Sequence, residues 1–83
     1  MKTGSPEYRR ERNLETARAL HQLTQAYGHP PTIIEIGERM GYEGTAAKRR
    51  VQSLIDDGWA ERRTYHRSLR LTAKGIREMG RAT

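Results

Sequence analysis

The sequence predicts a mainly α-helical fold class with one small β-hairpin, and three observations carry this prediction. Between Leu14 and Ile55, apolar residues recur at spacings of three and four, which is the helical period. Glycines at 28, 41 and 58 interrupt this pattern and divide it into three helices. After the third of these glycines, apolar and polar residues alternate, as is typical of strands.

The first predicted helix starts at Ser5, Pro6 and Glu7 and ends at Tyr27. Serine can cap a helix, proline suits the first helical position, and glutamate favours the positive helix end. One apolar stripe runs along this helix and consists of Leu14, Ala17, Leu20, Leu23 and Tyr27. The Gly-His-Pro-Pro run at 28–31 ends the helix, because proline cannot continue the hydrogen-bond ladder.

A short second helix is predicted from the capping-box pattern of Thr32 and Glu35, in which each side chain bonds to the other residue's backbone. Its inward-facing residues are Ile33, Ile36 and Met40. Gly41 ends this helix, and the tight turn 42–44 follows.

The third predicted helix covers 45–57, with Thr45 as its cap and Gly58 as its end. Its core face consists of Ala47, Val51, Leu54 and Ile55. The opposite face consists of Thr45, Arg49, Gln52 and Ser53, with Lys48 and Arg50 at its two edges. The third helix is therefore expected to bury a narrow aliphatic strip and to expose a polar, basic surface.

Two strands are predicted at 59–63 and 68–72, joined by a polar tip at 64–67. Thr72 is expected to cap a last short helix that runs through Met79, with Ile76 and Met79 facing inward, although Gly75 is unfavourable there. Three aromatic residues are assigned to the core: Tyr27, Tyr42 and Trp59. Together these elements form one domain, 1–83, in which 1–6 and 80–83 are expected to be mobile.

Composition limits the functions that this chain can have. It has 83 residues, no cysteine and no apolar run long enough for a membrane span. Lys and Arg total 16 against 10 Asp and Glu, which gives a net charge of +6, and the whole excess lies in residues 44–83. A one-sided basic charge favours a polyanionic partner, with nucleic acid first. We expect a cytoplasmic protein, associated with the nucleoid if it is bacterial.

This order of elements is that of a winged helix-turn-helix: a three-helix core, a two-stranded wing and a short C-terminal helix. The stretches 28–32, 35–42 and 51–59 resemble the DNA-binding domain of LexA-type repressors, and the resemblance covers roughly residues 14–71. It implies sequence-specific binding of double-stranded DNA, usually as a transcriptional repressor. The third helix would then lie in the major groove and the hairpin tip would be the wing. The family's self-cleaving domain has no counterpart in these 83 residues, so self-cleavage is not implied.

The DNA-binding residues predicted in this way lie at the start of the third helix and in the hairpin. They are Thr45, Ala46, Lys48, Arg49, Arg50, Gln52, Ser53, Arg63, Tyr65, His66 and Arg67. Arg49 could fork onto a guanine and Gln52 could pair with an adenine. The turn before this helix is about one residue shorter than the family's. The positions that read bases are basic here, where many members carry Glu or Asn, so the recognised sequence must differ.

The main alternative is a winged-helix protein-interaction module, for example a phage or mobile-element protein that binds a host polymerase. Its only candidate aromatic anchors are Tyr8 and Tyr65. No enzymatic activity and no cofactor are expected, because no nucleophile is paired with a base and no phosphate-binding loop is present. No metal site is expected, because the three histidines lie on different predicted elements. One recognition helix covers few base pairs, so a homodimer on DNA or tandem sites stay open.

Overall fold

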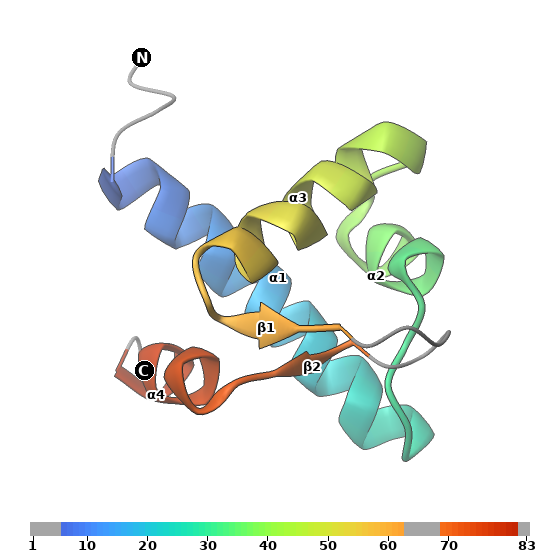
Figure 1. Ribbon diagram of the computed structural model, residues 1–83. Helices are drawn as coiled ribbons and strands as arrows, with labels where there is room; N and C mark the ends of the chain where they lie inside the picture. The colour runs from blue at the N-terminus through green and yellow to red at the C-terminus, as the bar shows by residue number, and fades with distance from the viewer. Residues whose placement is uncertain (1–5, 63–68, 82–83) are drawn as a thin grey trace.

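The computed structural model describes residues 6–62 and 69–81, which form four helices and a two-stranded antiparallel sheet (Figure 1). The mainly helical fold class with a small β-hairpin is confirmed in this form. In chain order the elements are α1 (Pro6–Tyr27), α2 (Ile33–Met40), α3 (Gly44–Asp56), β1 (Ala60–Glu61), β2 (Arg70–Leu71) and α4 (Ala73–Arg81). Predicted site residues 63 and 65–67 fall outside the described part of the chain.

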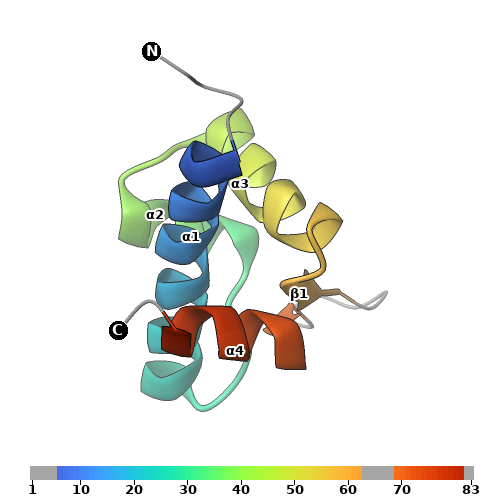
Figure 2. The ribbon, with the colours of Figure 1, turned by 90° about the vertical axis from the view of Figure 1, so that its left-hand side faces the viewer.

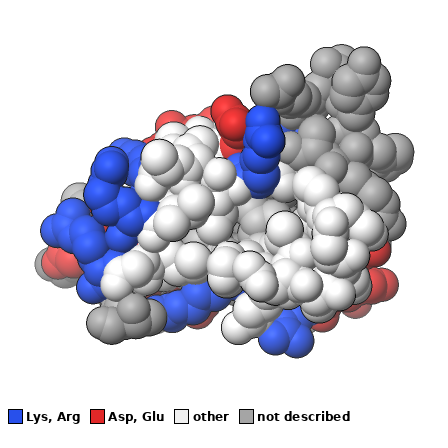
Figure 3. Space-filling view, turned by 90° about the horizontal axis from the view of Figure 1, so that it is seen from below, with Lys and Arg blue, Asp and Glu red and all other residues white. Residues whose placement is uncertain are grey.

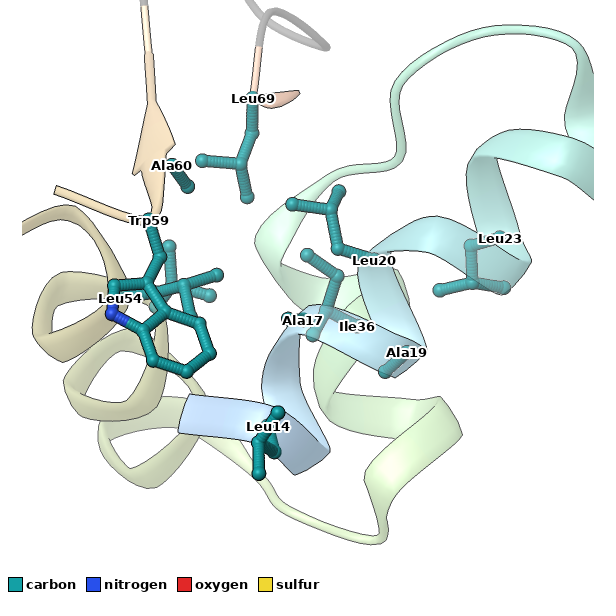
Figure 4. Close-up of a cluster of buried hydrophobic side chains, with 11 residues drawn as sticks. Leu14, Ala17, Ala19, Leu20, Leu23, Ile36, Leu54, Trp59, Ala60 and Leu69 are labelled. Carbon is teal, nitrogen blue, oxygen red and sulfur yellow. The ribbon is translucent and has the colours of Figure 1, made fainter. Parts of the chain in front are cut away.

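The long helix α1 is the centre of the fold. It packs against α2 and α3 on one side and against β2 and α4 on another, and α4 crosses it in the side view (Figure 2). The buried cluster contains residues of α1, α2, α3 and β1 together with Trp59 and Leu69, and Leu71 of β2 and Met79 of α4 pack against it. Figure 4 shows its labelled members, which are Leu14, Ala17, Ala19, Leu20, Leu23, Ile36, Leu54, Trp59, Ala60 and Leu69. Nearly all of the chain's few aliphatic residues therefore serve one small core.

The predicted ends of α1 and α2 are confirmed. The helix α1 ends at Tyr27, and Gly28 follows with a φ of 76°. At the start of α2, the Thr32 hydroxyl accepts from the Glu35 backbone at 3.1 Å, and the Glu35 carboxylate accepts from the Thr32 backbone at 2.8 Å. Gly41 ends α2 in the left-handed conformation, as the sequence indicates.

The predicted N-cap of α3, Thr45, is wrong by two residues. Glu43 is the N-cap and makes no side-chain capping bond, so Thr45 lies inside the first turn and does not cap the helix. The physical reason is a backbone hydrogen bond from Ala46 to the Glu43 carbonyl at 3.0 Å, which places Gly44 and Thr45 inside the first turn. The helix ends at Asp56, with Asp57 as its C-cap.

The β-hairpin is shorter than predicted. Among the residues that the structure describes, two pairs join the strands, Ala60 with Leu71 and Glu61 with Arg70. The backbone N–H of Trp59 donates to Leu54 at the end of α3, at 2.9 Å, so this residue still belongs to the helix terminus. Trp59 itself is buried in the core, as predicted.

Two predicted core side chains are exposed, and α4 is longer than expected. Thr72 caps α4 as predicted, because its hydroxyl accepts from the Gly75 backbone at 3.1 Å. The helix continues past Met79 through Arg81, into the segment assigned to a mobile end, just as α1 already includes Pro6. Ile76 is 56% exposed, because α4 turns its Gly75 side toward the sheet. Tyr27 is 43% exposed and lies beside the His29 ring, at the last turn of α1.

Candidate nucleic-acid interface

The outer face of α3 is formed by four exposed side chains, Thr45, Lys48, Arg49 and Gln52. Their spacing of three and four residues places them on the side opposite the buried residues of the same helix. Within residues 6–62 and 69–81, neither Lys48 nor Arg49 makes an ion pair or a side-chain hydrogen bond. Their positive charges are therefore available to a partner.

The C-terminal end of this outer face is acidic. The Gln52 side-chain amide donates to the Asp56 carboxylate at 2.8 Å, one helical turn further along. The outer face of α3 thus changes from basic near its N-terminus to acidic near its C-terminus. This polarity favours approach of a polyanion to the first two turns of the helix.

The other three predicted contacts on α3 are turned toward the protein. The Ser53 hydroxyl donates to the Asn13 side chain at 3.0 Å, so the prediction that Ser53 points outward is wrong. The reason is the buried amide of Asn13 on α1, which needs a polar partner. Ala46 and Arg50 are half-buried at the edge of the outer face.

Tyr42, in the turn before α3, contacts cations of both α1 and α3. The Arg12 guanidinium of α1 lies 5.5 Å from the centre of the Tyr42 ring, and that of Arg50 lies 5.3 Å from it. Arg12 also donates to the Tyr42 hydroxyl and lies 5.7 Å from the Tyr8 ring. Tyr42 is therefore half-buried between two cations instead of lying in the apolar core, and the sequence did not reveal this.

The close packing of α2 on α3 depends on Gly37, which no local pattern in the sequence indicates. Gly37 is buried, and a Cβ atom there would lie 2.7 Å from the Cβ of Ala47 and 2.9 Å from the Tyr42 carbonyl oxygen. Only glycine allows this approach without a shift of one helix. Together with the Tyr42 contacts, Gly37 sets the angle at which α3 presents its outer face.

A polar cluster holds the far end of α3 against α1 and α4. The Asp57 carboxylate accepts from Arg9 and from Asn13, each at 2.6 Å, and Lys74 donates to the Asp57 backbone carbonyl at 3.1 Å. The hydrogen bond from Arg9 lowers the pKa of Asp57, partial burial opposes this shift, and Asn13 and Lys74 reinforce it. The same bond raises the pKa of Arg9. Arg9 and Asn13, both on α1, lie more than forty residues before Asp57 in the sequence, so no local pattern indicates their contacts with it.

The hairpin part of the predicted site is described only at its base. Arg62 is exposed, and Arg70 donates to Glu61 across the two strands at 3.2 Å. The predicted contacts of Arg63, Tyr65, His66 and Arg67 stay predictions, because these residues lie outside the described ranges.

Comparison with family models, with curated proteins and with solved structures finds no match to this chain. Among the residues that the structure describes, no group of three or more His, Asp or Glu side chains could hold a metal ion. No helix in the same ranges has the length and apolar character needed to cross a bilayer. The fold and the site thus define a mainly helical protein with a small antiparallel sheet and one basic, unpaired helix face.

Proposed function

We propose that this protein binds double-stranded DNA as a winged helix-turn-helix and regulates transcription, most simply as a repressor. The observation that carries the proposal is the outer face of α3, where Lys48 and Arg49 are exposed and unpaired within the described residues. An α-helix fits the major groove, and a basic outer face meets phosphates on both walls. The resemblance of 28–59 to LexA-type DNA-binding domains supports the same assignment.

Three side chains on this face have distinct parts in the proposal. Arg49 presents a planar fork that fits the two acceptors of guanine, and the Gln52 amide fits adenine once it leaves Asp56. Lys48 lies at one edge of the face, where a point charge binds a phosphate. Arg50 lies at the other edge, over the Tyr42 ring.

The packing of α2 and α3 supports a rigid presentation of this face. Gly37 and Ala47 bring the two helices into close contact, and the ring of Tyr42 fills the turn between them. A helix that enters the major groove needs such a fixed angle, because base contacts require side chains placed to within a fraction of an ångström.

The test starts with selection of bound duplexes from a random pool, followed by affinity measurements on the selected sequence. Arg49→Ala should weaken binding about 10- to 100-fold and relax specificity at one base pair. Arg18→Ala is the matched control, because Arg18 is exposed on α1, away from the outer face of α3. Arg67→Ala should weaken all sequences alike, because a wing residue would contact the backbone.

The affinity of the wild-type protein should also fall steeply as salt rises, since each neutralised phosphate releases counterions. Absence of duplex binding by micromolar protein at about 50 mM salt would contradict the proposal. Even the non-specific affinity of such proteins for DNA is strong enough at this low salt concentration to be detected with micromolar protein. Equal losses in the Arg49 and Arg18 variants would contradict the assignment of the outer face of α3.

A further inference from the structure

An apolar groove lies between α2 and α3, beside the turn that joins them. It has a volume of about 430 Å³, and its apolar walls include Ile33, Ile34 and Ala47. Ile34 is 72% exposed, which makes it the most exposed large apolar side chain in the described ranges. An aliphatic side chain so open to water is stabilised when a partner covers it.

The rim of this groove is acidic, although the chain as a whole is strongly basic. Glu38 and Glu43 line it, both are exposed, and neither side chain has an ion-pair partner among residues 6–62 and 69–81. Lys48 lies at the border between the groove and the outer face of α3. The groove therefore favours an occupant that offers one aliphatic side chain with a positive charge next to it.

The exposed face of α4 has this chemistry. It consists of Ala73, Ile76, Arg77 and Gly80, which share one side of the helix. Ile76 is 56% exposed, and the small residues on either side leave it projecting as a knob. Arg77 is exposed beside it and has no ion-pair partner in the described part of the chain. Lys and Arg gather at the end of the molecule where α4 lies, and much of the rest of this view is uncharged (Figure 3).

We propose that α4 of one copy of this protein docks into the α2–α3 groove of a second copy, with Ile76 against Ile34 and Arg77 against Glu38 and Glu43. The helices that line the groove, α2 and α3, lie on the other side of the molecule from α4 (Figure 1), so the two surfaces of one copy meet two different neighbours. Such a contact is head-to-tail, and the assembly keeps one groove free at one end and one α4 face free at the other for further copies. This inference does not depend on DNA binding.

The contact is small, so its affinity is weak. Interfaces below about 1,200 Å² are typical of transient encounters. Self-association is therefore expected only at high protein concentration, and it should weaken as salt screens the pairing of Arg77 with the glutamates.

The experiment is sedimentation equilibrium of the whole chain at rising concentration and low salt. The wild-type mass should rise above the monomer value of 9.6 kDa. Ile34→Ser and Ile76→Ser should each stay monomeric, and serine has nearly the same helix propensity as isoleucine, so both helices are retained. Gln25→Ser, at an exposed position of α1, is the matched control and should associate like the wild type. Circular dichroism spectra of all variants should coincide.

The decisive sample is an equimolar mixture of the Ile34→Ser and Ile76→Ser variants. The first keeps a good α4 face and the second keeps a good groove, so the mixture should form a dimer and stop there. A wild-type protein that stays monomeric at about 1 mM, where even millimolar affinity is visible, overturns the proposal. A mixture that stays monomeric also overturns it, because only a head-to-tail contact is restored by mixing. Neither result affects duplex binding, which is measured separately with a single site.

Discussion

Gly75 of α4 packs directly against the backbone carbonyl group of Trp59. A Cβ atom at Gly75 would overlap this carbonyl oxygen and would lie 3.2 Å from a methyl group of Leu71. Glycine is a poor helix former, and its local effect is to weaken α4. Here its small size lets α4 close over the start of the hairpin, while the Trp59 indole stays in the core (Figure 4).

Replacement of Gly75 by alanine should therefore destabilise the protein, although alanine favours helices. We expect the free energy of unfolding to fall by about 2 kcal/mol, because the backbone of α4 must shift away from Trp59. Gly80→Ala is the matched control on the same helix, since a Cβ there meets nothing within 4 Å. It should raise stability by up to about 1 kcal/mol. Urea unfolding followed by circular dichroism measures both, and equal effects would contradict the packing argument.

Local signals in the sequence were sufficient for most helix boundaries. The capping box of Thr32 and Glu35 could be predicted because its partners are three residues apart. The buried strip of α3 could be predicted because Val51 and Leu54 follow the helical period. Periodicity also indicates a face for Ile76 and Tyr27, but it does not tell how far the neighbouring elements extend. Tyr27 lies at the last turn of α1, whereas Ile76 is exposed because α4 turns its Gly75 side toward the sheet.

In the candidate site, too, the sequence predicts the features set by helix geometry and misses those set by distant contacts. The exposure of Lys48, Arg49 and Gln52 follows from helix geometry and is confirmed. The orientation of Ser53 depends on Asn13, which is forty residues away on another helix, and sequence spacing carries no information about that contact. The assignment of these residues to DNA binding stays a prediction until binding is measured.

Acid should weaken the polar cluster that joins α1 to the end of α3. The pKa of Asp57 is lowered in the folded state, chiefly by the hydrogen bond from Arg9. Its stabilising effect is therefore complete above the ordinary aspartate pKa of about 3.9 and is lost as the pH falls through the lower, folded value. Asp57→Asn should reduce stability at neutral pH and should flatten the acid limb of the stability curve.

Urea unfolding at a series of pH values from about 7 down into the acid range follows this loss. Arg9→Gln should produce the same pattern, and the double variant should lose little more than either single one, because both remove one interaction. Asp56→Asn is the control, since its carboxylate accepts a hydrogen bond from Gln52 on the same helix, and its charge is the smallest of the causes that raise the pKa of Arg9. An unchanged acid limb in Asp57→Asn would contradict the pKa argument.

The ring of Tyr42 should matter more than its hydroxyl group for the outer face of α3. Tyr42→Phe keeps the ring between Arg12 and Arg50 and loses only the hydrogen bond from Arg12. Tyr42→Leu removes both cation–π contacts, each of about 0.5 to 1 kcal/mol at such a site. We expect leucine to lower the unfolding free energy by about 1 to 2 kcal/mol, and phenylalanine to lower it by less. Duplex affinity should follow the same order, because Arg50 loses its support only in the leucine variant. Equal losses in the two variants would contradict this assignment, because both remove the hydroxyl group and only leucine removes the ring.

The two proposals together predict how copies would be arranged on DNA. A head-to-tail contact repeats in one orientation, so it suits binding sites in direct repeat and not in inverted repeat. A duplex with two selected sites in the same orientation, spaced by one helical turn of about 10.5 base pairs or a multiple, should bind the second copy more tightly than a single site does. Ile34→Ser should abolish this gain and leave single-site affinity unchanged, because Ile34 lies in the groove and outside the outer face of α3. A gain on inverted repeats that survives Ile34→Ser would instead require a symmetric contact elsewhere on the molecule.

The single-site duplex reports DNA binding alone, and the two-site duplex reports binding together with the contact between copies. Comparison of the two duplexes therefore separates a loss of cooperativity from a loss of DNA binding.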